Sequence, residues 1–344
     1  MLGLILSGGA GTRLRPLTNT IAKQLLPIAN KPILHYAIEE MVRVGISEIG
    51  IILGHTGLQV RESVGDGSIF GAKVTYIDQG APLGLAHCVL LARDFLNEEN
   101  FLMFLGDNMF EFGLATFIQS FESNLALTSN FAAQVAVFEV DNPSQFGVAE
   151  VAPSQQVLKV VEKPVIPSTN LALVGTYGFT SKIFGAIQKI APSNRGELEI
   201  TDAIQQLIED EFDVRASSVN GWWMDTGNPD SYLECNKRVL NDELRNTPLK
   251  SHKGNGTVIQ PSTIGDNVFI EDAIVGPYVS LSDGVQVVGV DIKDSIILAG
   301  TRIAGGGSIH HSIIGKNCVL EFSDKKSSHS LVLGDDCSLL GERN

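Results

Sequence analysis

The sequence predicts an α/β domain built on a mostly parallel sheet, followed by a parallel β-helix of short repeats. Over about the first 240 of the 344 residues, short apolar runs alternate with helix-like stretches. This alternation is typical of a parallel sheet covered by helices on both faces. From about residue 250, helical periodicity gives way to short aliphatic runs separated by Gly, Asp, Asn and Pro. We therefore expect two domains, residues 1–245 and 246–344, joined in the polar stretch 245–256.

The elements of the first domain follow from the order of the apolar runs. Strands are expected at 2–6, 48–53, 73–77 and 101–105, and helices at 32–44, 57–64 and 84–96. Ligands of such sheets bind beyond the carboxyl ends of the strands. The loop 7–13 and the turn Gly106-Asp107-Asn108 fall at that kind of position, so we expect the ligand site there.

A repeat defines the second domain. The tripeptides Ser295-Ile296-Ile297, Ser312-Ile313-Ile314 and Ser330-Leu331-Val332 recur after 17 and then 18 residues. Aliphatic residues also return every six positions, as at Val275, Leu281 and Val287. Three hexads per ~18 residues describe one coil of a triangular β-helix, in which each aliphatic side chain points inward and stacks on its equivalent one coil away.

The loop after the first strand indicates phosphate binding. Gly8, Gly9 and Gly11 have no Cβ, so the backbone can take positive φ and bring its N–H groups against phosphate oxygens. Arg13 then adds a planar, permanently charged fork for the same oxygens. The spacing is not G-x-G-x-x-G, and no Lys-Ser or Lys-Thr pair follows the glycines. The pattern therefore argues against a P-loop ATPase and a dehydrogenase.

Composition restricts the partners. The chain has 25 Lys and Arg against 39 Asp and Glu, a formal charge of −14 that repels nucleic acid and anionic membranes. We therefore expect small-molecule substrates and a homo-oligomer, with no nucleic acid and no membrane. No signal peptide or membrane span is recognised, and the spacing of the cysteines fits neither a metal motif nor a disulfide scaffold. A cytoplasmic protein is expected. The four cysteines are Cys88, Cys235, Cys318 and Cys337.

The segment G-G-x-G-T-R-L-x-P-L-T, followed by Lys23 and the pair Lys31-Pro32, resembles the signature of the sugar-1-phosphate nucleotidyltransferases. The resemblance covers residues 1 to about 240, and the tail is similar to that of the longer family members. It implies a Rossmann-like nucleotidyltransferase domain followed by a left-handed parallel β-helix. It also implies Mg²⁺-dependent, in-line transfer of a nucleotidyl group from dTTP, or UTP, to glucose 1-phosphate with release of pyrophosphate.

The resemblance assigns roles to residues of this chain. The nucleotide-binding set is Leu6, Gly8, Gly9, Gly11, Thr12, Gln79, Gly84 and Asp107. The catalytic cations are Arg13, Lys23 and Lys163. The sugar-binding set is Gly147, Glu162, Val174, Gly175 and Tyr177. The Mg²⁺ ligands are Asp107 and Asp225.

Several of these residues also have a simpler interpretation. An Asp after a strand is more often a turn former or helix cap than a metal ligand, and Asp225 could cap the helix that begins near Pro229. Thr201 or Asp202 is expected to cap the helix that follows them. A Gln such as Gln79 can pair with the pyrimidine edge shared by thymine and uracil, so the side chain does not distinguish dTTP from UTP.

Two other functions remain open from the sequence. The β-helix could be an acyltransferase that uses His310, His311 or His329 as a base, although its aliphatic composition favours packing and assembly. The chain could also be a non-catalytic sensor of nucleotide sugars, but a sensor would not need all of the cations and carboxylates named above.

Overall fold

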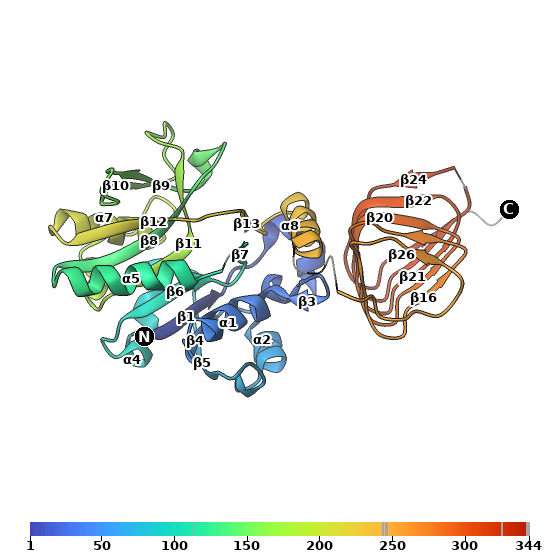
Figure 1. The fold of residues 1–344 in the computed structure, drawn as a ribbon, viewed down its shortest axis with the longest axis horizontal. Helices are drawn as coiled ribbons and strands as arrows, with labels where there is room; N and C mark the ends of the chain where they lie inside the picture. The colour runs from blue at the N-terminus through green and yellow to red at the C-terminus, as the bar shows by residue number, and fades with distance from the viewer. Residues whose placement is uncertain (112, 243, 245–246, 325, 342–344) are drawn as a thin grey trace. The chain divides into compact units, whose positions relative to one another are not determined.

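A computed structural model describes residues 1–111, 113–242, 244, 247–324 and 326–341 (Figure 1). The chain packs into two compact units. The first comprises Met1–Gly9 and Leu34–Met224, and the second comprises Ala10–Ile33 and Asp225–Asn344. The predicted boundary at 245 and 246 stays a prediction, whereas the observed grouping puts segment 10–33 in one unit with the β-helix.

The first unit is built on a nine-stranded sheet with seven strands in the order β10-β9-β11-β6-β1-β4-β5. Of the other two strands, β8 pairs with β11, and β12 pairs with β8. The strands are β1 Leu2–Ser7, β4 Glu48–Leu53, β5 Lys73–Asp78, β6 Phe101–Leu105, β8 Phe131–Glu139, β9 Gly147–Val151, β10 Val157–Glu162, β11 Leu171–Phe179 and β12 Asp213–Ser218. The pairs among β6, β1, β4 and β5 are parallel, as predicted, and the later strands β9–β11 add antiparallel pairs.

Helices cover this sheet, and a short ribbon stands beside it. The helices are α1 Ile33–Arg43, α2 Gly57–Val64, α3 Leu85–Leu91, α4 Arg93–Leu96, α5 Ala115–Leu127, α6 Lys182–Ile187 and α7 Ile200–Glu209. The strands of the ribbon are β7 Asn108–Phe110 and β13 Trp223–Asp225. The predicted helix at 84–96 is split at Ala92 into α3 and α4. The other predicted elements agree with the structure within a residue or two.

The register of the parallel strands places their carboxyl ends at one edge. Leu6 of β1 lies opposite Ile52 of β4 on one side and Leu105 of β6 on the other. Each strand is buried on both faces, which explains its near-continuous apolar sequence. The turns after these three strands, at Gly8, Gly54 and Gly106, therefore share the edge where ligands of such sheets bind.

The second unit contains the β-helix, whose parallel strands stack coil upon coil (Figure 1). Its strands are β14 Thr257–Val258, β15 Thr263–Ile264, β16 Phe269–Glu271, β17 Ile274–Val275, β18 Val279–Leu281, β19 Gln286–Val288, β20 Asp291–Ile297, β21 Arg302–Gly305, β22 Ser308–Ile314, β23 Val319–Phe322, β24 Ser328–His329, β25 Val332–Leu333 and β26 Ser338–Leu340. Val275, Leu281 and Val287 are fully buried, as predicted for the inward aliphatic residues, whereas Leu339, at a later position of the six-residue repeat, is 42% exposed. The left-handed sense stays a prediction.

The sequence misplaced the register of the last coil by one residue. The tripeptide comparison puts Leu331 opposite Ile313, but Ile313 pairs with Val332 and Ile314 with Leu333. The preceding coil pairs Ile297 with Ile314 after 17 residues, whereas the last one takes 19. Extra residues between β23 and β25 shift the strand, which a search for similar tripeptides does not reveal.

The expected cap of α7 was wrong, and the helix that begins at Pro229 is capped by a residue other than Asp225. Helix α7 begins at Ile200 with Glu199 at its N-cap, and Thr201 instead donates a hydrogen bond of 3.0 Å to Glu162. At the start of α8, Pro229–Asp242, the side chain of Asn228 accepts from the backbone N–H of Ser231 at 3.0 Å. Asn228 therefore provides the cap, and this simpler interpretation of Asp225 falls away.

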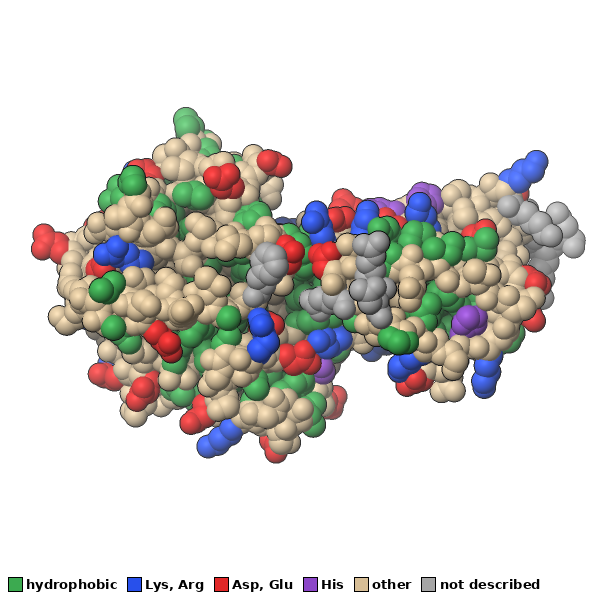
Figure 2. All heavy atoms as spheres, viewed as in Figure 1, with side chains coloured by type: hydrophobic (Ala, Val, Ile, Leu, Met, Phe, Trp, Pro, Cys, Tyr) green, Lys and Arg blue, Asp and Glu red, His purple; other side chains and the backbone are tan. Residues whose placement is uncertain are grey.

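Figure 2 shows how charged side chains are distributed on one face of the molecule. Acidic and basic side chains are interspersed on the face shown in Figure 2, with no broad basic patch there. Among the described helices, none has the length and apolar character needed to cross a bilayer.

Candidate active site

Close backbone packing in the first unit explains two of the glycines at the sheet edge. A Cβ on Gly8 would clash with Oε1 of Gln79, whose backbone N–H bonds to Leu53 at 2.9 Å. A Cβ on Gly54 would lie 3.0 Å from Cα of Gly8. The structure therefore brings Gln79, the predicted base-recognition residue, against the glycine-rich loop. Gly9, beside Gly8, is exposed.

In the second unit, the rest of the loop presents cations to a carboxylate. Gly11 has φ of 62°, and its carbonyl accepts a 2.8 Å bond from Thr18, so the chain turns into the short 3-10 helix Thr12–Leu14. Nη2 of Arg13 lies 3.4 Å from Oδ2 of Asp225, and Nζ of Lys23 lies 3.8 Å from Oδ1. The side chain of Arg13 is 61% exposed and that of Lys23 only 8%. The arrangement places one exposed and one buried positive charge beside the same carboxylate.

Asp107, in the first unit, is oriented by a chain of hydrogen bonds. The indole Nε1 of Trp223 donates to Oδ1 of Asn108 at 2.6 Å, and Nδ2 of Asn108 donates to Oδ1 of Asp107 at 3.0 Å. The side chain of Asn108 is buried, so both ends of its amide are used to hold the carboxylate. A Cβ on Gly175, where φ is 67°, would lie 2.8 Å from Oδ1 of Asn108, which explains that glycine.

Glu162, one of the predicted sugar-binding residues of the first unit, is held by neighbouring side chains. Its carboxylate accepts from Arg195 at 2.9 Å and from Thr201 at 3.0 Å, and Nζ of Lys163 lies 3.7 Å away. A Cβ on Gly147 would lie 2.5 Å from the methyl group of Thr201. Glu162 is thus fixed by two donors and remains partly exposed, as a hydroxyl acceptor must be.

Three predicted residues lie in the core instead of at the surface of the site. Leu6 is 6% exposed, Val174 is 0% exposed and Tyr177 is 4% exposed. Burial raises the pKa of Tyr177, so its hydroxyl stays protonated. Gly84 has φ of 103°, and its close approach to the backbone of Leu198 leaves no room for a side chain. These residues therefore pack in the core or against neighbouring backbone.

Comparison with known proteins gives the family of the chain. The model of the nucleotidyl transferase family matches residues 2–242. The chain belongs to the nucleotidyl transferase family. It is 42% identical to a glucose-1-phosphate thymidylyltransferase of Streptomyces griseus over 97% of this chain and 98% of that protein. It is 48% identical to the low-salt glycan biosynthesis nucleotidyltransferase Agl11 of Haloferax volcanii, over 78% of this chain and 72% of Agl11.

A solved structure extends the likeness to three dimensions. A Bacillus anthracis protein assigned as a glucose-1-phosphate thymidylyltransferase, in complex with sucrose, is 33% identical and superposes with a TM-score of 0.63. The match covers 69% of this nucleotidyltransferase and 94% of that chain.

Sequence reasoning missed several residues of the candidate site. Arg195 bonds to Glu162 and to Glu199, each at 2.9 Å, and stands five positions before the start of α7. Gly54 follows a predicted strand just as Gly8 and Gly106 do, and that shared position was the available signal. The role of Asn108 had no local signal, because its partner Trp223 is 115 residues away.

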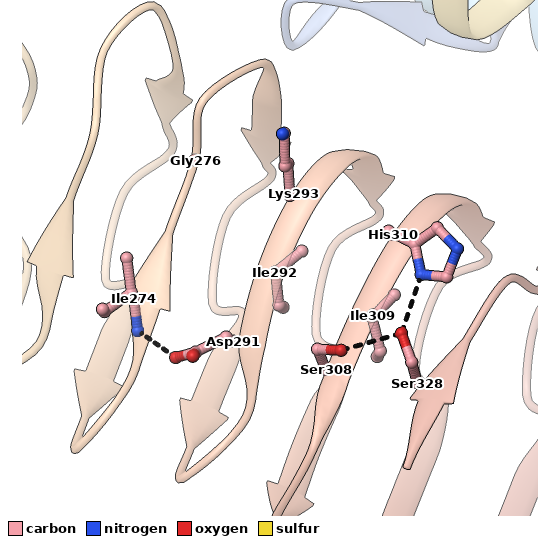
Figure 3. A pocket seen from close by; sticks show the side chains of 9 residues that line it. All are labelled: Ile274, Gly276, Asp291, Ile292, Lys293, Ser308, Ile309, His310 and Ser328. Atoms are coloured by element: carbon pink, nitrogen blue, oxygen red, sulfur yellow. Dashed lines mark hydrogen bonds between the residues drawn. The ribbon is translucent and has the colours of Figure 1, made fainter. Parts of the chain in front are cut away.

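The three histidines proposed as bases for acyl transfer are not together in the β-helix. His310 lines a cavity of about 310 Å³, where its Nδ1 is hydrogen-bonded to Ser328 at 3.2 Å (Figure 3). His311 instead lies 3.1 Å from both Asp294 and Asp230, and these hydrogen bonds raise its pKa. His329 stacks on Phe322. Only His310 of the three lines this cavity.

The contact between Gly8 and Gln79 makes a testable prediction. Gly8→Ala should lower the free energy of unfolding by about 1–3 kcal/mol, because Gln79 must leave its place. In a Gln79→Ala background the same change should cost less than ~0.5 kcal/mol, since the clash is gone. Urea denaturation of the four proteins measures the coupling.

Gly185→Ala is the matched control, because a Cβ there meets no atom within 4 Å. Equal costs of Gly8→Ala in both backgrounds would contradict the contact.

Proposed function

We propose that this nucleotidyltransferase transfers a thymidylyl group from dTTP to α-D-glucose 1-phosphate, giving dTDP-glucose and pyrophosphate. The observation that carries the proposal is the placement of Arg13 and Lys23 on Asp225, directly after a glycine-rich loop. The likeness to the Streptomyces griseus thymidylyltransferase over nearly the whole of both chains supports dTTP and glucose 1-phosphate as the substrates.

The proposed reaction needs alignment and charge neutralisation. An oxygen of the sugar phosphate attacks the α-phosphorus in line, the bond between the α-phosphorus and the bridging oxygen breaks, and pyrophosphate leaves with that oxygen. Both substrates are anions, and the attacking oxygen is already ionised, so no general base is required. Arg13 would bind the β- and γ-phosphates, Lys23 the α-phosphate and Lys163 the phosphate of the sugar.

The remaining residues would select the substrates. Gln79 would pair with the pyrimidine edge beside Gly8, and Glu162 would accept hydrogen bonds from hydroxyls of the hexose. The orientation of Glu162 by Arg195 and Thr201 supports this role, because both carboxylate oxygens are already directed by a donor.

We propose Asp107 and Asp225 as ligands of a magnesium ion from the chemistry of their side chains. Asp107 and Asp225 are partly exposed carboxylates, and Mg²⁺ prefers one or two such oxygens together with phosphate and water. Asn108 donates to Oδ1 of Asp107 and so orients the carboxylate. Asp107 and Asp225 would hold the ion, which when bound would neutralise charge on the α-phosphate.

Pyrophosphate release tests the proposal. Purified protein with Mg²⁺ and glucose 1-phosphate would be given dTTP, UTP, ATP, GTP or CTP in parallel. We expect the highest kcat/KM with dTTP. Preference for UTP would overturn the thymidylyl assignment and keep the reaction type, and no release with any triphosphate would overturn the proposed reaction.

Removal of one cation should slow the reaction without unfolding the protein. Arg13→Ala is expected to lower kcat/KM for the triphosphate about 100- to 1,000-fold, by analogy with loss of one donor to a developing charge. Arg15→Ala is the control, because Arg15 is an exposed cation two residues away. Near-normal turnover of Arg13→Ala at saturating Mg²⁺ would refute the assigned role.

The indole of Trp223 should affect metal affinity. Trp223→Phe keeps the ring beside Phe146 but removes the donor to Asn108, so Asp107 loses its orientation. We expect the Mg²⁺ concentration for half-maximal pyrophosphate release to rise about tenfold. Activity should return at high Mg²⁺.

Phe138→Leu provides the comparison, because it loses a ring contact with Trp223 and keeps the N–H bond. Identical Mg²⁺ titrations of Trp223→Phe and the unmodified protein would contradict a role for the hydrogen bonds from Trp223 through Asn108 to Asp107.

A further inference from the structure

The turn of a small hairpin in the second unit has an unusual backbone. Strands β2, Pro27–Ile28, and β3, Lys31–Pro32, are joined by Ala29 and Asn30, with φ of 49° and 65°. Two positive φ values are typical of a two-residue type I′ hairpin turn, which favours Asn and Gly. Alanine is uncommon in this region, so the conformation at Ala29 needs support from its surroundings.

That support comes from α8 and the β-helix. Oδ1 of Asn236, a residue of α8 that is 1% exposed, accepts from the N–H of Ala29 at 2.9 Å and from the hydroxyl of Ser280 at 2.7 Å. Asn30 donates to the carbonyl of Leu281 at 2.8 Å and accepts from Ser282 at 3.0 Å. The turn is therefore clamped to the coil Ser280–Ser282.

Ser280 is a buried polar residue within the repeat. In the β-helix register it aligns with Thr263 on one side and with Ile296 on the other. Ile296 aligns in turn with Ile313, and both isoleucines are buried on strands that contact α8. A buried hydroxyl costs free energy unless it is hydrogen-bonded, so an isoleucine would suit simple packing better. The serine is explained by its bond to Asn236.

The clamped turn lies close in sequence to Lys23. Lys23 begins the 3-10 helix Lys23–Leu25, whose C-cap residue Leu26 bonds back to Lys23 at 3.2 Å and directly precedes β2. The other residue of the ion pair, Asp225, stands four positions before the start of α8, the helix that carries Asn236. The same hydrogen bonds thus restrain the segments on both sides of the pair.

We propose that Asn30 and Asn236 are positioning residues that fix Lys23 by tying its segment to the β-helix. The β-helix then contributes to nucleotidyl transfer through this contact, in addition to any role in assembly. This inference rests on the proposed function for the role of Lys23 at the α-phosphate.

Asn30→Gly is the decisive variant. Glycine accepts the positive φ of the turn without strain, so the hairpin is kept while both side-chain bonds to Leu281 and Ser282 are lost. We expect kcat for pyrophosphate release from dTTP and glucose 1-phosphate to fall about 10- to 100-fold. Asn236→Ala should lower kcat at least as far, because the N–H of Ala29 and the hydroxyl of Ser280 both lose their acceptor.

Ser312→Ala is the matched control. Ser312 is fully buried, as Ser280 is. Its hydroxyl donates to the carbonyl of His310 and accepts from the N–H of Leu331, so both hydrogen bonds stay within the β-helix. We expect it to lower the thermal midpoint by at least as much as Asn30→Gly and to keep the unmodified kcat. A loss of kcat in Ser312→Ala equal to that in Asn30→Gly would overturn the proposal, as would an unchanged kcat in Asn30→Gly.

Amide hydrogen exchange gives a readout that does not depend on activity. Exchange in residues 20–28 should be faster in Asn30→Gly than in the unmodified protein and unchanged in Ser312→Ala. If the unmodified protein releases no pyrophosphate, the proposed function fails and exchange alone decides the clamp. Unchanged exchange in Asn30→Gly would overturn the clamp whatever the activity.

Discussion

Close approach of backbone segments at the carboxyl edge of the parallel strands is the constraint on which the site depends. Gly8 and Gly54 pack against each other, and Gln79 fills the space that a side chain at Gly8 would need. An anion can reach backbone N–H groups only where no side chain intervenes. The same contact brings Gln79, the candidate base-recognition residue, beside Gly8 of the candidate phosphate loop. Base recognition and phosphate binding would therefore depend on the same packing.

Much of the first unit could be predicted because its signals are local. Strands buried on both faces read as continuous apolar runs, and the glycines and aspartates that follow them mark the sheet edge. The hydrogen bonds that orient the site could not be predicted in this way. Trp223 reaches Asn108 across 115 residues, and Arg195 reaches Glu162 across 33. Neither pair has a spacing that periodicity or turn chemistry can detect.

The grouping of the chain shows a similar limit. The loss of helical periodicity near residue 250 predicted two consecutive domains. In the structure, however, segment 10–33 packs in one unit with the β-helix. The contacts responsible are polar and specific: Asn30 bonds to Leu281 and Ser282, and Asn236 to Ser280. From sequence alone, Ser280 is one more small polar residue in a repeat rich in them. Its role appears only in the structure, where the buried hydroxyl donates to Asn236.

The coil that contains β24, β25 and β26 shows how much variation in length the β-helix accepts. In a solenoid each coil contacts only its neighbours, so the pairing of its strands with the coil before it is what matters. Here the spacing changes from 17 to 19 residues, and Leu339 and Leu340 of the final strand are 42% and 61% exposed. Strands β24, β25 and β26 nevertheless all pair with the preceding coil, so the stack tolerates a change of coil length without loss of strand pairing.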